Sequence, residues 1–287
     1  MSKVIILLGQ RVRSGTNFVG STMAMHPDVV TLPPNKSLGE FNLFYDNAII
    51  DNVFIKVAQK SFGLEVSVKE QDGFLKLYGA SWLQLLIKKY AIKEDQIIFI
   101  KSPVIHTINL WEKTFPESQI AVIYRDGRDN VISSVKASND NRNWHTFSIK
   151  LKKRWNYYSG RSFINHTKDW VVTANKVASI ANTKQVQKFK YEDLNNSEEN
   201  IEKLLQHFKL RCNADILNAC LQAPVVGSSF GIDTKKMAKP NWTPETDKSK
   251  FKFSNKWNHW KFFKKAVFKY LAGKELIVLE YEKDNKW

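Results

Sequence analysis

Cysteine is scarce in this chain of 287 residues: Cys212 and Cys220 are its only two, too few for a disulfide framework. We expect both thiols to pack in the interior of a protein from a reducing compartment, here the cytoplasm. The sequence also lacks any run of about 18 apolar residues, so it predicts no membrane span. The apolar run at residues 4–8 is too short for a signal peptide, and no small-residue cleavage site follows it.

Acidic residues are also few, with 28 Asp and Glu against 44 Lys and Arg, which gives a formal net charge of +16. Such an excess favours an anionic partner: a nucleotide, nucleic acid, anionic glycan or membrane surface. A solvated, lysine-rich surface is the plainer explanation, so the charge alone selects no function. Hydrophobic residues make up 43% of the chain, which is typical of a globular protein and excludes a wholly disordered one.

Short apolar runs alternate with stretches of helical periodicity. Four runs are typical of strands buried on both faces of a parallel sheet: residues 4–8, 97–100, 120–124 and 186–191. Helices are expected between and after them, over residues 18–25, 74–91, 105–114, 130–137, 197–205 and 257–272, the last closed by Gly273. This alternation predicts an α/β fold, a doubly wound parallel sheet with helices on both faces. With no repeat or interdomain linker, residues 1–287 are expected to form one domain.

A polar turn at residues 9–16 lies between the first predicted strand and helix, where a phosphate-binding loop is expected. The N-terminus of a helix offers N–H groups and a partial positive charge to a phosphate. A Walker loop requires Gly-x4-Gly-Lys-Ser/Thr, but here five residues separate Gly9 from Gly15, and Thr16 follows without a lysine. The basic residue of the turn is Arg13, so a nucleotide-kinase interpretation is weakened. An ordinary turn capped by a hydroxyl side chain is the other interpretation.

Two motifs resemble those of sulfotransferases that use 3′-phosphoadenosine-5′-phosphosulfate (PAPS) as donor. Arg13-Ser14-Gly15-Thr16-Asn17, followed by a helix and His26-Pro27-Asp28, resembles the 5′-phosphosulfate loop of this family. Arg125 after a central strand, with Ser133 eight residues later, resembles the pair that binds the donor's 3′-phosphate.

Two later segments also resemble this family. Residues 190–194 are similar to a family segment that follows a late strand, and residues 255–281 are similar to the family's C-terminal end. The four motifs follow the family's order, and they are most similar in kind to those of tyrosylprotein and glycan sulfotransferases. The resemblance implies the same P-loop-like α/β fold, and an enzyme that moves a sulfuryl group from PAPS to an acceptor hydroxyl.

The resemblance also implies roles for individual residues. Arg13 would stabilise the transition state and leaving group, and Lys101, at the end of the second long predicted strand, would stabilise the departing oxygen or sulfuryl group. Tyr191 and Trp257 would border the adenine or, equally, belong to the core. The full set of donor-binding candidates is Arg13, Ser14, Gly15, Thr16, Asn17, Arg125, Ser133, Tyr191, Lys256 and Trp257.

Sulfuryl transfer also requires a base for the acceptor hydroxyl. Glu40 resembles the acidic position of the family and is the expected base; apolar residues at 41–44 predict the partly buried start of a helix around it. A capping or surface carboxylate is the other interpretation of Glu40. His106 is the alternative base, because small-molecule sulfotransferases use a histidine in that general region.

The acceptor pocket is expected to come from loops near residues 35–60, 138–160 and 224–250. Residues 224–256 have no regular pattern and are expected to form a long surface loop. The acceptor would be a sugar hydroxyl, a peptide tyrosine or a small alcohol or phenol, anionic ones included. The six histidines show no metal-ligand spacing, so no metal is expected.

Two other function classes stay open. A P-loop kinase or hydrolase would need the missing Walker lysine and an acidic Mg²⁺ ligand after a strand. A non-enzymatic binder of nucleic acid or anionic polymer would use the basic and aromatic residues of segment 150–158, although aromatics at helical spacing more often pack on the sheet. The resemblance favours the enzyme, with no nucleic acid partner.

Overall fold

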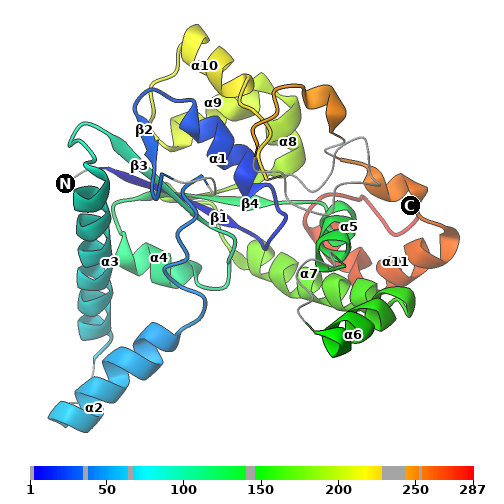
Figure 1. The fold of residues 1–287 in the computed structure, drawn as a ribbon, viewed down its shortest axis with the longest axis horizontal. Helices are drawn as coiled ribbons and strands as arrows, with labels where there is room; N and C mark the ends of the chain where they lie inside the picture. Colours follow the sequence, from blue (N-terminus) through cyan, green and yellow to red (C-terminus); the bar gives the residue numbers. More distant parts are fainter. Residues whose placement is uncertain (1–2, 35–37, 64–66, 140–145, 228–242, 252–253) are drawn as a thin grey trace.

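The computed structural model describes residues 3–34, 38–63, 67–139, 146–227, 243–251 and 254–287 (Figure 1). Within these residues, five parallel strands form one sheet in the order β2-β3-β1-β4-β5. The strands are β1 (Val4–Gly9), β2 (Val29–Thr31), β3 (Ile97–Ser102), β4 (Gln119–Tyr124) and β5 (Val186–Lys190). All four predicted strands are present. The fifth, β2, was not predicted because three half-buried residues make no recognisable run.

The central strand β1 is buried along its whole length. Successive side chains of a strand point to opposite faces of the sheet. Ile6 and Leu8 therefore join one hydrophobic cluster, and Ile5 and Leu7 join the other. A core on each face explains why the strands have continuous apolar runs instead of alternating ones.

Helices cover both faces of the sheet, which confirms the doubly wound α/β prediction (Figure 1). The cluster around Ile5 includes residues of α1 (Thr16–Ala24), α8 (Tyr191–Asn196), α9 (Glu198–His207) and α10 (Ala214–Leu221). The cluster around Ile6 includes residues of α3 (Val68–Tyr90), α4 (Ile108–Thr114), α5 (Gly127–Ser138), α7 (Arg161–Ser179) and α11 (Phe262–Val278).

The last helix differs from its prediction. The helix α11 begins at Phe262 and continues through Gly273 to Val278, so the expectation that Gly273 closes it is wrong. A Cβ atom on Gly273 would lie 2.5 Å from the side-chain oxygen of Asn285. The glycine is therefore explained by close packing of the C-terminal segment against α11, a contact that the local sequence does not encode.

Two helical segments lie outside the helices that cover the sheet. One is the π-helix η1 (Ile49–Ile55) with α2 (Lys56–Phe62), and α2 extends away from the sheet in Figure 1; the other is α6 (Phe147–Tyr158), which lies against α7. No side chain of α6 is buried in the described structure, so the expected packing of its aromatic residues on the sheet is wrong. Of the predicted loop 224–256, residues 228–242 and 252–253 lie outside the described part. The rest is mostly irregular, with one short 3-10 turn, η3 (Lys248–Lys250).

In the part of the chain that the structure describes, no helix is both long enough and apolar enough to cross a membrane.

Candidate active site

The motifs that the sequence singles out meet at the carboxyl ends of the strands. The loop 10–15 follows β1, Lys101 lies near the end of β3, and Arg125 follows β4. Tyr191 begins α8 directly after β5. Because all these strands are parallel, the four segments share one edge of the sheet, where ligands of open α/β sheets bind.

The loop after β1 is shaped by a glycine. Gly15 adopts a left-handed conformation, with φ of 102°, and is the N-cap residue of α1. A Cβ atom at this position would lie 2.2 Å from the ring of Tyr191, so only glycine permits the contact. In the described structure no side chain caps α1, which disfavours the hydroxyl-capped turn. The first N–H groups of α1 remain suited to an anion.

Buried polar side chains hold this loop in place. The Ser14 hydroxyl accepts a hydrogen bond from the Arg11 amide at 3.2 Å, and the Asn130 amide donates to the Val12 carbonyl at 3.3 Å. Arg11 in turn donates to the His166 carbonyl of α7 at 2.8 Å. The loop is thus attached to both α5 and α7.

Arg125 connects the loops after β1, β4 and β5. Its guanidinium donates to the Arg13 carbonyl at 3.2 Å, lies 4.5 Å from the centre of the Tyr191 ring, and approaches Glu192 at 4.0 Å. Its own amide donates to the side chain of Gln10 at 3.3 Å. These contacts fix a nearly buried guanidinium beside the loop that follows β1.

Positive charge is concentrated where the loop and Arg125 meet. Burial lowers the pKa of Arg13, and the nearby positive charge of Arg125 lowers it further. Ser133 is buried in the second turn of α5, which begins two residues after Arg125. Two clustered guanidinium groups beside the start of a helix form a favourable site for a phosphate.

A second group of side chains surrounds Lys101, which is fully buried. Its ammonium donates to the Asn17 side-chain oxygen at 2.8 Å and to a carboxylate oxygen of Glu40 at 3.3 Å. Desolvation lowers the pKa of Lys101, and the charge of Glu40 partly opposes this effect. Three residues predicted separately from the sequence are therefore in contact.

Glu40 does not begin a helix, and that expectation is wrong. The segment around it forms a bridge beside the end of β3: the Lys101 amide donates to the Gly39 carbonyl, and the Phe41 amide donates to the Lys101 carbonyl, both at 2.8 Å. Gly39 has a φ of 78°, and a Cβ on it would lie 2.8 Å from the Phe99 carbonyl. Of the apolar residues that suggested a helix, Phe44 is buried because it packs against Trp111, and Phe41 and Leu43 are partly buried.

The remaining candidates have different surroundings. His106 is exposed in the turn between β3 and α4. Tyr191 is buried beneath Gly15, where burial raises its pKa to about 12. Trp257 lies in a 3-10 turn, η4 (Lys256–His259), with its ring 3.8 Å from the guanidinium carbon of Arg128. Both rings therefore make packing contacts within the protein, and their role beside the adenine stays a prediction.

Several residues at this edge of the sheet were not among the site residues predicted from the sequence. The Asp129 carboxylate accepts from the amides of Asn255 and Lys256, at 2.6 and 2.8 Å, and so attaches the C-terminal segment to α5. Gln10 accepts a hydrogen bond from the Arg125 amide, and Asn130 donates one to the Val12 carbonyl. Glu192 lies beside the Arg125 guanidinium. No local pattern marks these residues, because each acts through partners distant in the sequence. Arg128 forms ion pairs with Asp126 and Glu282.

Among the described residues, no cluster of three or more His, Cys, Asp and Glu side chains could hold a metal ion.

A profile of the sulfotransferase family matches residues 5–214. The match spans more than half of the chain, which therefore belongs to the sulfotransferase family. Comparison with curated protein sequences gives no match.

Solved structures that resemble the chain include the sulfotransferase domain from the Synechococcus PCC 7002 olefin synthase, at 13% identity over 95% of this chain and 94% of that one, with a TM-score of 0.48. Mouse sulfotransferase SULT7A1, solved in complex with PAP, has 13% identity over 98% of this chain and 88% of that one, with a TM-score of 0.49. The sulfotransferase domain from the curacin biosynthetic pathway has 15% identity over 98% of each chain, with a TM-score of 0.49.

Proposed function

We propose that this protein transfers a sulfuryl group from PAPS to an acceptor hydroxyl. The observation that carries the proposal is the contact of Lys101 with both Glu40 and Asn17 at the edge of the sheet that also holds the phosphate loop. A base, a buried cation and an anion-binding helix terminus are the three elements that in-line transfer of a charged group requires. Membership of the sulfotransferase family supports the same reaction.

On the donor side, the backbone of residues 14–17 and the Thr16 hydroxyl would hold the 5′-phosphate at the start of α1. Arg125 and Ser133 would hold the 3′-phosphate, because a guanidinium fixed by its neighbours can offer two parallel hydrogen bonds. Lys256 is a further candidate for this phosphate, since Asp129 fixes its backbone beside the start of α5.

On the acceptor side, Glu40 would take the hydroxyl proton as the acceptor oxygen attacks sulfur. The bond between sulfur and the 5′-phosphate oxygen breaks in the same step, and adenosine 3′,5′-bisphosphate leaves. Lys101 and Arg13 would stabilise the negative charge that develops on the sulfuryl and leaving oxygens. Lys101 already contacts Glu40, so the base and the cation are held together before an acceptor binds.

The proposal extends to the wider properties of the protein. The acceptor is a hydroxyl compound such as a glycan, a peptide tyrosine or a small alcohol or phenol. No metal or nucleic acid takes part, and the compartment is the cytoplasm, in keeping with the two free cysteines. Residues 1–287 would act as one domain, because Phe268 of α11 packs against Trp170 of α7, inside the segment that matches the family.

The test has two parts. Thermal-shift measurements should show that adenosine 3′,5′-bisphosphate stabilises the protein more than ATP with Mg²⁺ or a single-stranded oligonucleotide does, because only the first is a mononucleotide with phosphate monoesters at both the 3′ and the 5′ positions. A PAPS-dependent screen of glycans, peptides and small hydroxylated compounds should then reveal sulfate transfer that persists in EDTA. Preferential stabilisation by ATP with Mg²⁺, or turnover that requires a divalent ion, would contradict the proposal.

A further inference from the structure

The helix α6 is an exposed element outside the proposed sulfuryl site. None of its side chains is buried in the described structure, although it contains large apolar residues. The exposed fractions are 80% for Phe147, 63% for Trp155 and 82% for Tyr158. Leaving such side chains in water costs free energy that burial would recover.

The same helix is strongly basic. It carries Lys150, Lys152, Lys153 and Arg154, and no acidic residue occurs between positions 146 and 161. A helix that is apolar and basic at once, without acidic partners, is typical of segments that lie on an anionic surface.

The first turn of α11 has the same character. Phe262 and Phe263 are 86% and 77% exposed, and Lys261, Lys264 and Lys265 surround them. No acidic residue occurs between positions 254 and 274. This turn lies about a hundred residues after α6 in the sequence, so the two basic and apolar segments are separate parts of the chain.

Tertiary packing brings the two elements together at the start of α7. Phe163, two residues into α7, packs against Trp260 with ring centres 5.2 Å apart, and the Lys264 ammonium lies 5.6 Å from the centre of the Phe163 ring. The helix α6 ends only two residues before α7 begins. In Figure 1, α6 and α11 both lie next to α7.

We propose that this α6–α11 surface, residues 147–158 and 261–265, docks the protein onto a lipid bilayer that contains anionic lipids. The aromatic and aliphatic side chains would enter the interface between headgroups and acyl chains. The lysine and arginine side chains would reach the anionic headgroups, and each would add to the attraction. The inference stands on exposure, charge and packing, and it does not depend on the proposed reaction.

Charge and side-chain type favour lipid over the other anionic or apolar partners. Ile149 and Leu151 are exposed aliphatic residues, and they cannot stack on nucleic acid bases as aromatic residues do. A symmetric contact with a second copy would place basic residues against basic residues, with no acid in either segment to oppose them. An anionic bilayer satisfies both the apolar and the basic groups.

The experiment is co-sedimentation of the full chain with vesicles of phosphatidylcholine alone and of phosphatidylcholine mixed with phosphatidylglycerol. We expect binding to the mixed vesicles, little binding to the neutral ones, and weaker binding as salt is added. Trp155→Ser combined with Tyr158→Ser should weaken binding about tenfold or more, because the variant loses buried apolar area. Lys152→Glu combined with Lys153→Glu should do the same by reversing two charges.

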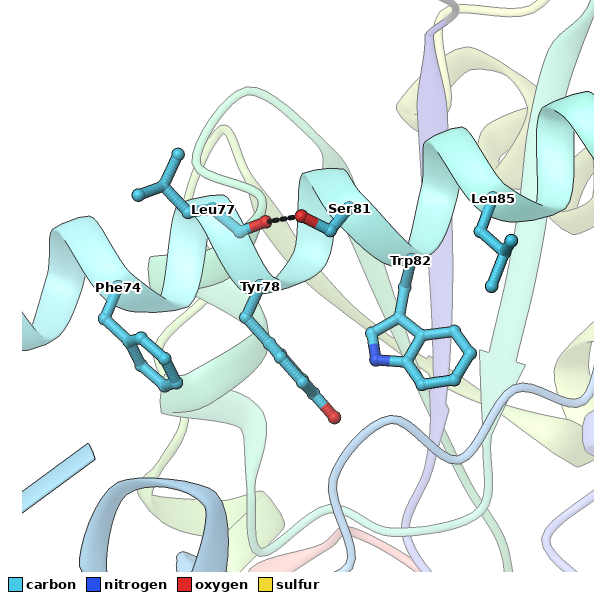
Figure 2. Close-up of a pocket in the computed structure, with 6 residues that line it drawn as sticks. All are labelled: Phe74, Leu77, Tyr78, Ser81, Trp82 and Leu85. Carbon is cyan, nitrogen blue, oxygen red and sulfur yellow. Dashed lines mark hydrogen bonds between the residues drawn. The ribbon is translucent and has the colours of Figure 1, made fainter. Parts of the chain in front are cut away.

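Matched control variants come from α3, which also has exposed apolar and basic residues. Its groove is lined by Phe74, Leu77, Tyr78, Ser81, Trp82 and Leu85 (Figure 2). Leu77→Ser, at a side chain that is 71% exposed, and the double variant Lys76→Glu with Lys88→Glu should leave vesicle binding unchanged. The melting temperature and the thermal shift by adenosine 3′,5′-bisphosphate, measured on all variants, show whether each one is folded.

Absence of binding to mixed vesicles, or equal losses in the α3 controls, would overturn the proposal. Two further results would also overturn it. The first is binding of a single-stranded oligonucleotide, but not of vesicles, that the α6 variants abolish. The second is self-association in sedimentation velocity that the Trp155 and Tyr158 substitutions abolish while no vesicles are bound. Each result would assign the surface to another partner, and none of them bears on donor binding.

Discussion

The ammonium of Lys101 lies 3.3 Å from a carboxylate oxygen of Glu40, which is 61 positions earlier in the chain. Lys101 is fully buried, whereas the side chain of Glu40 is 32% exposed. The pair therefore has one end fixed in the sheet and the other reachable from solvent. In the proposed reaction the cation would face the sulfuryl group while the carboxylate faces the acceptor.

The first prediction concerns Glu40 as the base. Glu40→Gln keeps the size of the side chain but cannot accept the acceptor's proton. Loss of a general base typically lowers the rate by about 10²- to 10⁴-fold. We expect a fall in kcat of that order, measured by PAPS-dependent turnover, with the affinity for adenosine 3′,5′-bisphosphate and the melting temperature nearly unchanged.

His106→Ala is the companion variant, because His106 is the alternative base. It should cost much less activity, since His106 is exposed while Glu40 contacts Lys101. An inactive His106→Ala together with an active Glu40→Gln would assign the base to His106. Full activity in both variants would place the base in another segment.

The second prediction concerns the 3′-phosphate. Arg125→Ala should weaken binding of adenosine 3′,5′-bisphosphate by about 1.5–3 kcal/mol, the range for a charge-assisted hydrogen bond. A ligand that lacks the 3′-phosphate, adenosine 5′-phosphosulfate, should bind nearly as before. Titration calorimetry with both ligands makes the comparison. Ser133→Ala, which removes one hydroxyl from α5, should show the same preference with a smaller loss. Equal losses for the two ligands would show that Arg125 supports the loop without binding this phosphate.

The third prediction concerns Gly15. An alanine there must adopt a left-handed conformation, which costs roughly 1–2 kcal/mol, and its Cβ would also collide with the buried ring of Tyr191. Gly63→Ala is the matched control, because Gly63 has a φ of 60° and a Cβ there would meet no atom of the described residues within 4 Å. Urea unfolding should therefore show a larger loss of stability for Gly15→Ala, accompanied by loss of donor binding. Equal losses would mean that the close approach to Tyr191 has no energetic effect.

The fourth prediction concerns pH. Burial raises the pKa of Glu192 from 4.5 to about 7, despite the nearby charge of Arg125. The folded protein therefore retains this proton at pH values where the unfolded chain has released it. Stability due to neutral Glu192 is fully present below about pH 4.5 and is lost as the pH rises through about 7.

Glu192→Gln removes this titration and stays neutral at every pH. The variant should be more stable than the wild-type protein at about pH 8, by on the order of 2–3 kcal/mol, and the two should converge towards about pH 4.5. Chemical unfolding across this range measures the difference. A variant that is less stable at about pH 8 would show that charged Glu192 is favourable beside Arg125.

The fold class could be predicted because each long strand is buried on both faces and so has a continuous apolar sequence. The run Val4–Leu8 and the turn that follows it also predicted a phosphate loop, and Gly15 is where the structure needs a glycine. These features depend on residues close together in the chain. Local sequence is sufficient when the determining contacts are local.

The contacts around Glu40 could not be predicted in the same way. The residues Phe41–Phe44 have an apolar pattern that fits a helix, but Gly39 and Phe41 bond instead to the end of β3. The same limit applies to α6, where helical spacing suggested burial and the structure shows exposure. In both cases the outcome depends on which distant surface is available to the segment.

The sequence by itself determined the four longer strands, the glycine-containing loop after β1 and the family motifs, since apolar runs and glycine positions reflect burial and backbone shape directly. Only the tertiary structure decided that Lys101 touches both Asn17 and Glu40, that Asp129 holds the C-terminal segment, and that the first turn of α11 packs against the start of α7. These outcomes depend on the order of strands in the sheet. That order is set by packing of both faces at once, which no single stretch of sequence specifies.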